Sequence, residues 1–437
     1  MTTPKYNLNV KQADYDQQIE LLLGSKRESS EDVRRKVSDI IDTVRRRGDE
    51  ALFELNRMFD RSDRREKGLR LTADEREAAL EQVTKEQKSA LEFAADRIRT
   101  YHEKHLPSDQ FDVDDMGVGL GWRWTAVDAT GVYVPGGTAA YPSTMLMNVI
   151  PAQVAKVKRI AMVTPLTDDQ VNPLVVAAAE LLGIDEIYAV GGAQAVAALA
   201  YGTKTIAPVD CIVGPGNAYV AAAKREVYGQ VGIDQIAGPS EILVVADNSN
   251  NPEWIAADLL SQAEHDPSSQ SLLITDNAQF GVEVIQAVAQ QLETLPRKKI
   301  AGRSWQDFGG VIVVDDLVGQ GAALANRVAA EHCLISGRAD VQQALFDNIR
   351  HAGAIFLGPH TPETLSDYVA GPNHVLPTSR SARFSSGLGV MNFMKRTSVL
   401  SVSRQGLEYL GAPAITLAQA EGLDAHARAV QIREPGK

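Results

Sequence analysis

The strongest constraint on the fold of this chain is a repeated alternation of short, unbroken apolar runs with helix-like stretches. The first series of apolar runs lies at residues 160–163, 187–190 and 211–213, and the second at 242–245, 272–274, 311–314 and 354–357. Such runs are typical of strands that helices cover on both faces. Two successive series therefore predict an α/β protein with two doubly wound parallel sheets, each an incomplete Rossmann-like domain.

Helical segments are expected before and after these strands. Apolar residues recur with helical period from Val33 to Val44, and Thr72 with Glu75 forms a capping box ahead of a charged amphipathic stretch. We expect an N-terminal arm at 1–30 and a first domain made of 31–130, with its helical part, and 239–380. The second domain is expected at 131–238. A small C-terminal segment, 381–437, is expected to be less regular and to end in a helix at 414–430.

Composition excludes several classes of protein. A length of 437 residues favours two or more domains, and a net charge of −12 without a basic stretch argues against nucleic acid as a partner. Two cysteines, Cys211 and Cys333, exclude a disulfide framework and fit a reducing cytoplasm. The first 25 residues have no apolar core of a secretory signal, and no run approaches ~18 apolar residues. We therefore expect a soluble cytoplasmic protein that does not bind membranes.

Two glycine-rich turns follow strand-like runs of the first series. Gly191-Gly192-Ala193-Gln194 follows 187–190, and Gly214-Pro215-Gly216-Asn217 follows 211–213. Backbone N–H groups and the helix dipole at such junctions favour phosphate. Neither turn has the G-x-G-x-x-G spacing, and glycine is also ordinary turn chemistry. The turns alone leave nucleotide binding and a plain turn equally supported.

Several histidines and carboxylates are candidate metal ligands. Gln262 and His265 lie three apart on one face of a predicted helix, whereas Asp367 and His426 are distant in sequence. Two imidazoles, a carboxylate and an amide oxygen could form a four-ligand site for zinc. Spacing pairs only Gln262 with His265, and an interaction of His265 with the helix dipole explains that residue equally well. For His426, a place on a helix surface is the better interpretation.

Glu331 and His332 are candidates for acid–base chemistry. Adjacent residues do not share one face of a helix or strand, so the two side chains serve different positions or different steps. A histidine with a pKa near ~6.5 is a natural proton acceptor at neutral pH. A Glu-His dipeptide is common, so this pair carries little weight by itself.

Seven motifs together resemble the histidinol dehydrogenase family, over about residues 30–433. They are GVYVPGG at 131–137, GGAQA at 191–195, GPGNA at 214–218, AGPSE at 237–241, SQAEHDP at 261–267, GPNHVLPT at 371–378 and AEGLDAHA at 420–427. Each motif alone is weak. Their common order along nearly the whole chain makes the resemblance specific.

The resemblance implies an NAD-dependent, zinc-requiring oxidation of L-histidinol to L-histidine, through the bound aldehyde and with two NAD in succession. It implies one zinc per subunit, a homodimer in which the C-terminal segment reaches the partner's site, and NAD binding by the domain at 131–238. The implied zinc ligands are Gln262, His265, Asp367 and His426, and the acid–base pair is Glu331 and His332. Ser240, His374 and Glu421 would join His332 and the zinc ligands around the substrate, and Tyr133, Gln194 and Asn217 would contact NAD.

One departure from the family pattern keeps alternatives open. The family commonly has proline before the catalytic glutamate and leucine after the histidine, where this chain has Ala330 and Cys333. Alanine frees the backbone ahead of Glu331, so we expect any weakness in the second oxidation. A related zinc- and NAD-dependent dehydrogenase of a sulfopropanediol is the nearest alternative, but Glu421 and the Asp-Ala-His ending favour histidinol. A zinc hydrolase that uses Glu331, and a metal-stabilised binding protein, are the other candidates.

Overall fold

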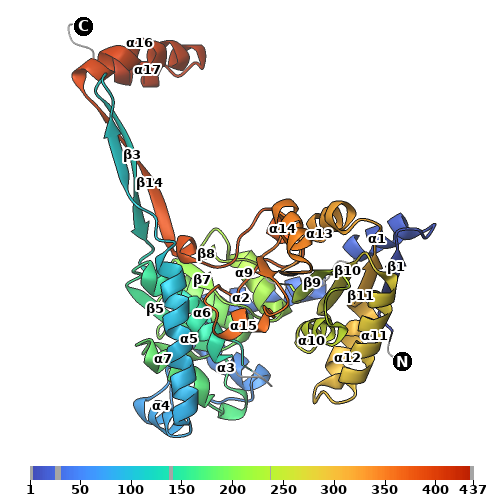
Figure 1. Cartoon of the computed structure of the whole chain (residues 1–437). Coiled ribbons are helices and arrows are strands. Elements are labelled where there is room, and N and C mark those ends of the chain that lie inside the picture. The colour runs from blue at the N-terminus through green and yellow to red at the C-terminus, as the bar shows by residue number, and fades with distance from the viewer. Residues whose placement is uncertain (1–2, 25–30, 137–140, 237, 434–437) are drawn as a thin grey trace.

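The computed structural model describes residues 3–24, 31–136, 141–236 and 238–433, arranged as two parallel sheets with their helices and a long antiparallel arm (Figure 1). Gly137 and Ala237, which belong to two of the glycine motifs, lie outside the described residues, as do parts of both terminal segments. The α/β class with two doubly wound parallel sheets is confirmed. Among the described residues, no helix has the length and apolar character that a membrane crossing requires.

The first sheet has six parallel strands in the order β1-β11-β10-β9-β12-β13. From β9 the chain adds β10 and β11 on one side and then β12 and β13 on the other, which is the doubly wound pattern. The strands are β1 (Tyr6–Asn9), β9 (Glu241–Ala246), β10 (Gln270–Thr275), β11 (Gly310–Val313), β12 (His332–Ser336) and β13 (Ala354–Leu357).

Helices cover both faces of this first sheet. Ile242 and Val244 face the helices α10 (Pro252–Ala263), α11 (Ala278–Leu292) and α12 (Lys298–Phe308). Leu243 and Val245 face α1 (Tyr15–Gly24), α13 (Ala322–Val328) and α14 (Ala339–Asn348). Successive residues of β9 thus enter two separate cores, which explains why β9 has no polar residue in its middle.

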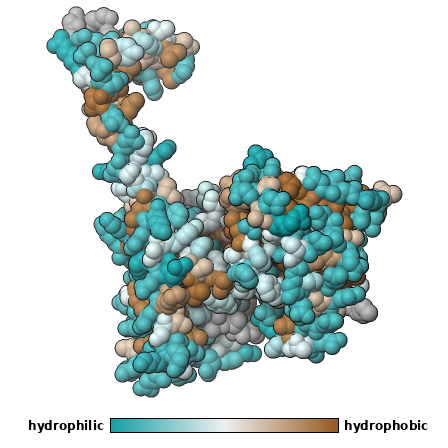
Figure 2. Space-filling view, in the orientation of Figure 1, coloured by the Kyte–Doolittle hydropathy of each residue, from teal (hydrophilic) through white to brown (hydrophobic). Residues whose placement is uncertain are grey.

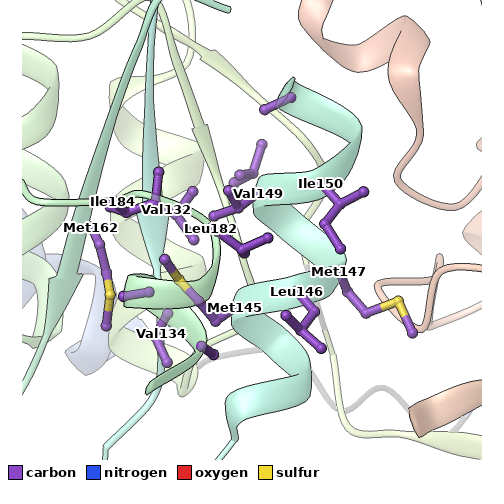
Figure 3. Close-up of a cluster of buried hydrophobic side chains, with 14 of the residues drawn as sticks. Val132, Val134, Met145, Leu146, Met147, Val149, Ile150, Met162, Leu182 and Ile184 are labelled. Carbon is purple, nitrogen blue, oxygen red and sulfur yellow. The ribbon is translucent and has the colours of Figure 1, made fainter. Parts of the chain in front are cut away.

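The second sheet repeats this topology with five parallel strands in the order β6-β5-β4-β7-β8. The strands are β4 (Ala129–Tyr133), β5 (Arg159–Thr164), β6 (Ile187–Ala189), β7 (Cys211–Val213) and β8 (Gly232–Ile233). Val132 and Met162 face the helix α6 (Pro142–Val154), where they meet Met145 and Val149 (Figure 3). The helices α7 (Pro173–Leu181), α8 (Gly192–Tyr201) and α9 (Ala218–Val227) complete the covering of this sheet.

The N-terminal helices pack on the second sheet, so the assignment of residues 31–130 to the first domain is corrected. Four helices are involved: α2 (Glu31–Arg47), α3 (Asp49–Phe59), α4 (Ala73–Leu80) and α5 (Lys85–Glu103). The helix α2 packs against α8 and α9, and α5 packs against α6. A helical period shows that one face is apolar, but it does not show which surface covers that face. The first sheet instead gains β1 of the N-terminal arm, which pairs in parallel with β11.

Residues after about 380 are more regular than expected. The strand β14 (Met394–Val402) runs antiparallel to β3 (Val118–Ala126), which also pairs with β2 (Gln110–Val113). Two helices follow, α16 (Arg404–Ala420) and α17 (Asp424–Gln431), where we expected one helix at 414–430. Gly422 has a φ of 74° between them, which breaks the helix. The strand β14 escaped the sequence analysis because it is exposed almost throughout and has no buried apolar run.

The paired strands β3 and β14 form a projecting arm, which carries α16 and α17 away from the two sheets (Figure 1). It exposes large apolar side chains, and Figure 2 shows hydrophobic residues along it. Among them are Leu120, Trp122, Leu400 and Leu417. An exposed apolar surface on a projecting element is typical of an interaction surface.

Candidate active site

The candidate residues lie at two sheet edges that the chain joins directly. The strand β8 ends at Ile233 and β9 begins at Glu241, so the chain leaves the carboxyl edge of the second sheet and enters the amino edge of the first. At ~3.3–3.6 Å per residue, the intervening segment 234–240 keeps the two ends within about 30 Å of each other. Gly238 N–H donates to Thr378 Oγ1 at 2.6 Å, which joins this segment to the loop that carries His374.

Glu331 is fixed at the amino edge of the first sheet by exchange of hydrogen bonds with Glu241. The N–H of Glu241 donates to Glu331 Oε2 at 2.9 Å, and the N–H of Glu331 donates to Glu241 Oε2 at 3.3 Å. The second oxygen of Glu241 accepts the N–H of Ser379 at 2.9 Å. All of this occurs where β9 and β12 begin side by side. Both carboxylates are buried, so these bonds hold them in one place.

The ring of His332 is held with one nitrogen available. Nδ1 lies 3.0 Å from the carbonyl oxygen of Glu241. Because a carbonyl oxygen only accepts, Nδ1 carries the hydrogen and Nε2 has a lone pair in the neutral ring. Nε2 is buried and has no hydrogen-bond partner among the described residues. Burial lowers the pKa of His332 to about 4, which keeps the imidazole neutral at pH 7.

Three predicted metal or substrate ligands gather around His332. Asp367, on α15 (Thr364–Tyr368), places Oδ1 at 3.9 Å from His332 Nε2, and burial raises the pKa of Asp367 to about 7. His374 Nδ1 lies 3.0 Å from the Asp367 carbonyl oxygen, and burial lowers the pKa of His374 to about 4. Besides burial, the electrostatic effect of His265 lowers the pKa of His332 and of His374.

Gln262 and His265 come from the end of α10. The N–H of His265 donates to the carbonyl of Gln262 at 3.2 Å, which closes the last turn; the residue is exposed as a whole, but burial of its ring lowers the pKa of His265. The Gln262 side chain is buried, and its Oε1 accepts no hydrogen bond within the described part of the chain. A buried amide oxygen without a donor is costly unless a ligand completes it. The chemistry of this oxygen fits a metal ligand.

Two predicted ligands lie elsewhere. Glu421, which directly follows α16, and His426, on α17, are exposed at the tip of the arm, away from the body that holds α10 and α15 (Figure 1). In the described ranges, no group of three or more His, Cys, Asp or Glu side chains is arranged to hold a metal ion. Within one chain, the end of α10 with Gln262 and His265 is joined to α15 with Asp367, since Ser261 Oγ donates to Glu363 Oε1 at 2.8 Å, whereas His426 lies on the arm.

The predicted cofactor residues lie at the carboxyl edge of the second sheet. Tyr133 ends β4, and its Oη accepts the N–H of Gly192 at 3.0 Å. Gln194, in the first turn of α8, is buried, and neither its Oε1 nor its Nε2 has a hydrogen-bond partner among the described residues. Asn217 caps α9, since its Oδ1 accepts from Tyr219 and Val220 N–H. Open α/β sheets bind ligands at this edge, beside the strand where the order reverses.

A cavity of about 320 Å³ opens at the same edge. It is lined by the backbone and side chains that follow β4 and β5, among them Pro135, Gly136 and Pro165, and by the start of α7. This volume is in the lower range of small-molecule sites, ~300–1,000 Å³.

Glu241 received no role from the sequence, although it ends the AGPSE motif at 237–241. The signal was available: a carboxylate opens an otherwise apolar strand that is buried on both faces. Ser240, the neighbouring predicted substrate ligand, is half-buried and its carbonyl accepts from Gln270 N–H at 2.9 Å.

The two departures from the family pattern lie in the core of the first sheet. Cys333 is buried in β12, and Ala330 is buried just before the pair. The Ala330 carbonyl accepts from Gly353 N–H at 3.0 Å, and the Glu331 carbonyl accepts from Ala354 N–H at 2.9 Å. Hydrogen bonds to β13 thus restrain the backbone where a proline would have done so.

Comparisons with known proteins agree on one family. The family model described as histidinol dehydrogenase matches residues 23–434. The histidinol dehydrogenase of Agrobacterium fabrum is 58% identical over 96% of this chain and 97% of its own length. That of Ruegeria pomeroyi is 57% identical over 98% of each chain. The crystal structure of histidinol dehydrogenase from Elizabethkingia anophelis is 35% identical, covers 98% of each chain and superposes with a TM-score of 0.92.

The Glu241–Glu331 exchange predicts a stability effect. In Glu241→Gln, the amide places an N–H₂ against one of the two backbone donors and leaves buried groups unpaired. We expect a loss of about 1–3 kcal/mol of unfolding free energy in urea denaturation. Glu283→Gln, on the exposed face of α11, is the control and should change stability by less than about 0.5 kcal/mol. Equal effects of the two substitutions would contradict this role of Glu241.

Proposed function

The chain belongs to the histidinol dehydrogenase family, and we propose that it oxidises L-histidinol to L-histidine with two NAD and one zinc per subunit. The observation that carries this proposal is the buried cluster at the amino edge of the first sheet. There, the free Nε2 of His332 lies 3.9 Å from Asp367, beside Glu331 and two further imidazoles. A base, a carboxylate and candidate metal ligands in one place fit the oxidation of an alcohol.

The zinc site is proposed on Gln262, His265 and Asp367, completed by His426 of the partner subunit. The first three supply an amide oxygen, an imidazole and a carboxylate, which are ligands that zinc accepts. The fit rests on the Gln262 oxygen, which lacks a donor in the described residues, and on the buried carboxyl of Asp367. Zinc, when bound, supplies a Lewis acid that holds the amino and imidazole nitrogens of the substrate.

The position of the last predicted ligands supports a homodimer. Glu421 and His426 lie on the arm and not at the body site of their own chain (Figure 1). The arm exposes Leu400 and Leu417, whose burial against a second copy would stabilise a dimer. We propose that each arm delivers both residues to the site of the other subunit.

NAD is proposed to bind at the carboxyl edge of the second sheet, where it supplies the hydride acceptor. The buried amide of Gln194 offers both a donor and an acceptor to a ligand. Tyr133 and Asn217 shape the turns on either side. The proposal is supported by the short chain segment 234–240, which connects this edge to the amino edge that carries His332.

Each residue of the acid–base pair serves one of the two oxidations, His332 the first and Glu331 the second. His332 accepts the hydroxyl proton of the alcohol at Nε2, while its Nδ1–H stays on the Glu241 carbonyl and holds the ring. Glu331 then removes a proton from the water that adds to the aldehyde, which prepares the second oxidation. Ser240 and His374, with Glu421 of the partner subunit, bind the substrate.

Two buried, unpaired thiols, Cys211 and Cys333, fit the proposed location in the reducing cytoplasm.

Purified protein should release about two NADH per L-histidinol, with one zinc per subunit in the same sample. The assay follows absorbance of NADH, and metal is measured by emission spectrometry. One NADH with trapped aldehyde would limit the reaction to the first oxidation and would locate the fault at Glu331 and Ala330. Activity on sulfopropanediol and none on histidinol would contradict the proposal, as would hydrolysis without NAD consumption.

His332→Asn tests the proposed base. We expect kcat to fall by roughly 10²–10⁴-fold because the amide cannot accept the substrate proton. Zinc content and thermal unfolding should stay at wild-type values. His351→Asn is the matched control, since His351 lies between α14 and β13 and has no proposed role. Wild-type kcat in His332→Asn would remove this residue from the mechanism.

His426→Ala tests the shared site. The variant should lose zinc and activity, while His332→Asn keeps zinc and loses activity. After the two variants are unfolded and refolded together, each mixed dimer contains one intact site, so roughly a quarter of wild-type activity should return. If mixed dimers form, as shown by mass spectrometry, and no activity returns, the site is not shared between subunits.

A further inference from the structure

A buried ion pair, Lys224 with Asp234, lies beneath the Gly214 turn and takes no part in the proposed chemistry. Lys224 belongs to α9, and Asp234 follows β8. Their side chains are 3% and 2% exposed. Removal of two charges from water costs several kcal/mol per ion, and a well-packed apolar pair is often as stable. The fold alone therefore does not require this pair, which directs attention to the groups that it holds.

Both charged side chains form hydrogen bonds with the backbone of Gly214. Lys224 Nζ donates to the Gly214 carbonyl at 2.9 Å, and Gly214 N–H donates to Asp234 Oδ2 at 2.8 Å. Gly214 has a φ of 111°, and a Cβ there would lie 2.2 Å from the Tyr133 carbonyl oxygen. The turn is therefore pressed against the end of β4. Tyr133, at the end of β4, accepts the N–H of Gly192, in the turn after β6. The Lys224–Asp234 pair, which binds Gly214 after β7, is therefore linked through Tyr133 to the other two turns.

The same pair begins the connection to the other sheet. Asp234 Oδ1 accepts the N–H of Gln235 at 2.6 Å. Gln235 Nε2 donates to the Leu376 carbonyl at 2.5 Å, in the loop that also carries His374. The pair thus lies between the cofactor edge and the substrate loop.

We propose that Lys224 and Asp234 are positioning residues for the dinucleotide: they hold the Gly214–Asn217 turn in its ligand-binding shape without touching the ligand. The inference rests on the proposed NAD site. A charge-assisted hydrogen bond to each polar group of Gly214 restrains the turn more firmly than neutral partners would. A turn that is already ordered spares the ordering entropy that binding would otherwise cost.

The test is the double variant Lys224→Met with Asp234→Asn. It removes both charges together, so no unpaired charge remains buried, and asparagine keeps an acceptor for Gly214 N–H. We expect the Kd of NAD alone, measured by calorimetry without substrate, to rise at least tenfold. The KM for NAD should rise in parallel, while kcat, the KM for histidinol and the zinc content change less than about twofold.

Arg159→Met with Glu186→Gln is the matched control. This ion pair joins β5 to the residue before β6 at the amino edge of the same sheet, and Arg159 also donates to the carbonyls of Ala207 and Pro208. It resembles the Lys224–Asp234 pair in chemistry but lies at the opposite edge of the sheet from the proposed cofactor site. We expect a lower Tm and an unchanged Kd of NAD.

The outcomes separate the two proposals. If wild-type protein does not bind NAD, the proposed function fails before the positioning role is tested. If wild-type protein binds NAD and the Lys224/Asp234 variant has the same Kd, or weakens it no more than the control does, the positioning role is overturned. Should the double variant not fold, Asp234→Glu replaces it, because it keeps both charges and moves the carboxylate by one methylene. A raised Kd there supports the role, and an unchanged Kd overturns it.

Discussion

The candidate site depends on the way in which β9 and β12 begin side by side. Glu241 opens β9 and Glu331 directly precedes β12; each carboxylate accepts the backbone N–H of the other glutamate, and the Glu241 carbonyl also accepts from His332. These bonds set the position of Glu331 and the tautomer of His332 together. A change in register between the two strands would separate the pair from Asp367 and His374. The parallel pairing of β9 with β12 thus builds the sheet and also positions the candidate acid–base pair.

The two doubly wound sheets use opposite edges. The proposed cofactor site follows the general rule for open α/β sheets, since it lies beyond the carboxyl ends of β4, β6 and β7. The proposed chemical groups lie at the amino edge of the first sheet, where that rule does not predict a ligand. The short connection from β8 to β9 makes this arrangement possible because it links one edge to the other. The proposed hydride donor and acceptor would meet between the two sheets, and the arm of a second subunit is proposed to complete the site.

The sequence predicted the sheets well because strands buried on both faces have no polar interruption. It could not predict the surface on which α2 and α5 pack, since an amphipathic helix shows an apolar face and not its partner. It missed β14, whose residues are exposed, and it overlooked Glu241. Among the metal candidates, spacing paired only Gln262 with His265. Asp367 lies on α15, which is joined to the end of α10, about 100 residues earlier, by a hydrogen bond from Ser261 Oγ to Glu363 Oε1; only the family resemblance or the folded chain reveals that contact.

We propose that the amino edge of the first sheet and the arm of a second subunit together form the zinc site. The most direct measurement is an anomalous difference map, recorded at the zinc absorption edge, from crystals of the zinc-loaded dimer. We expect one peak per subunit, about 2.0–2.2 Å from ligand atoms of Gln262, His265, Asp367 and His426 of the partner subunit. A peak elsewhere, or a peak at the body site without the partner's His426, would contradict the account.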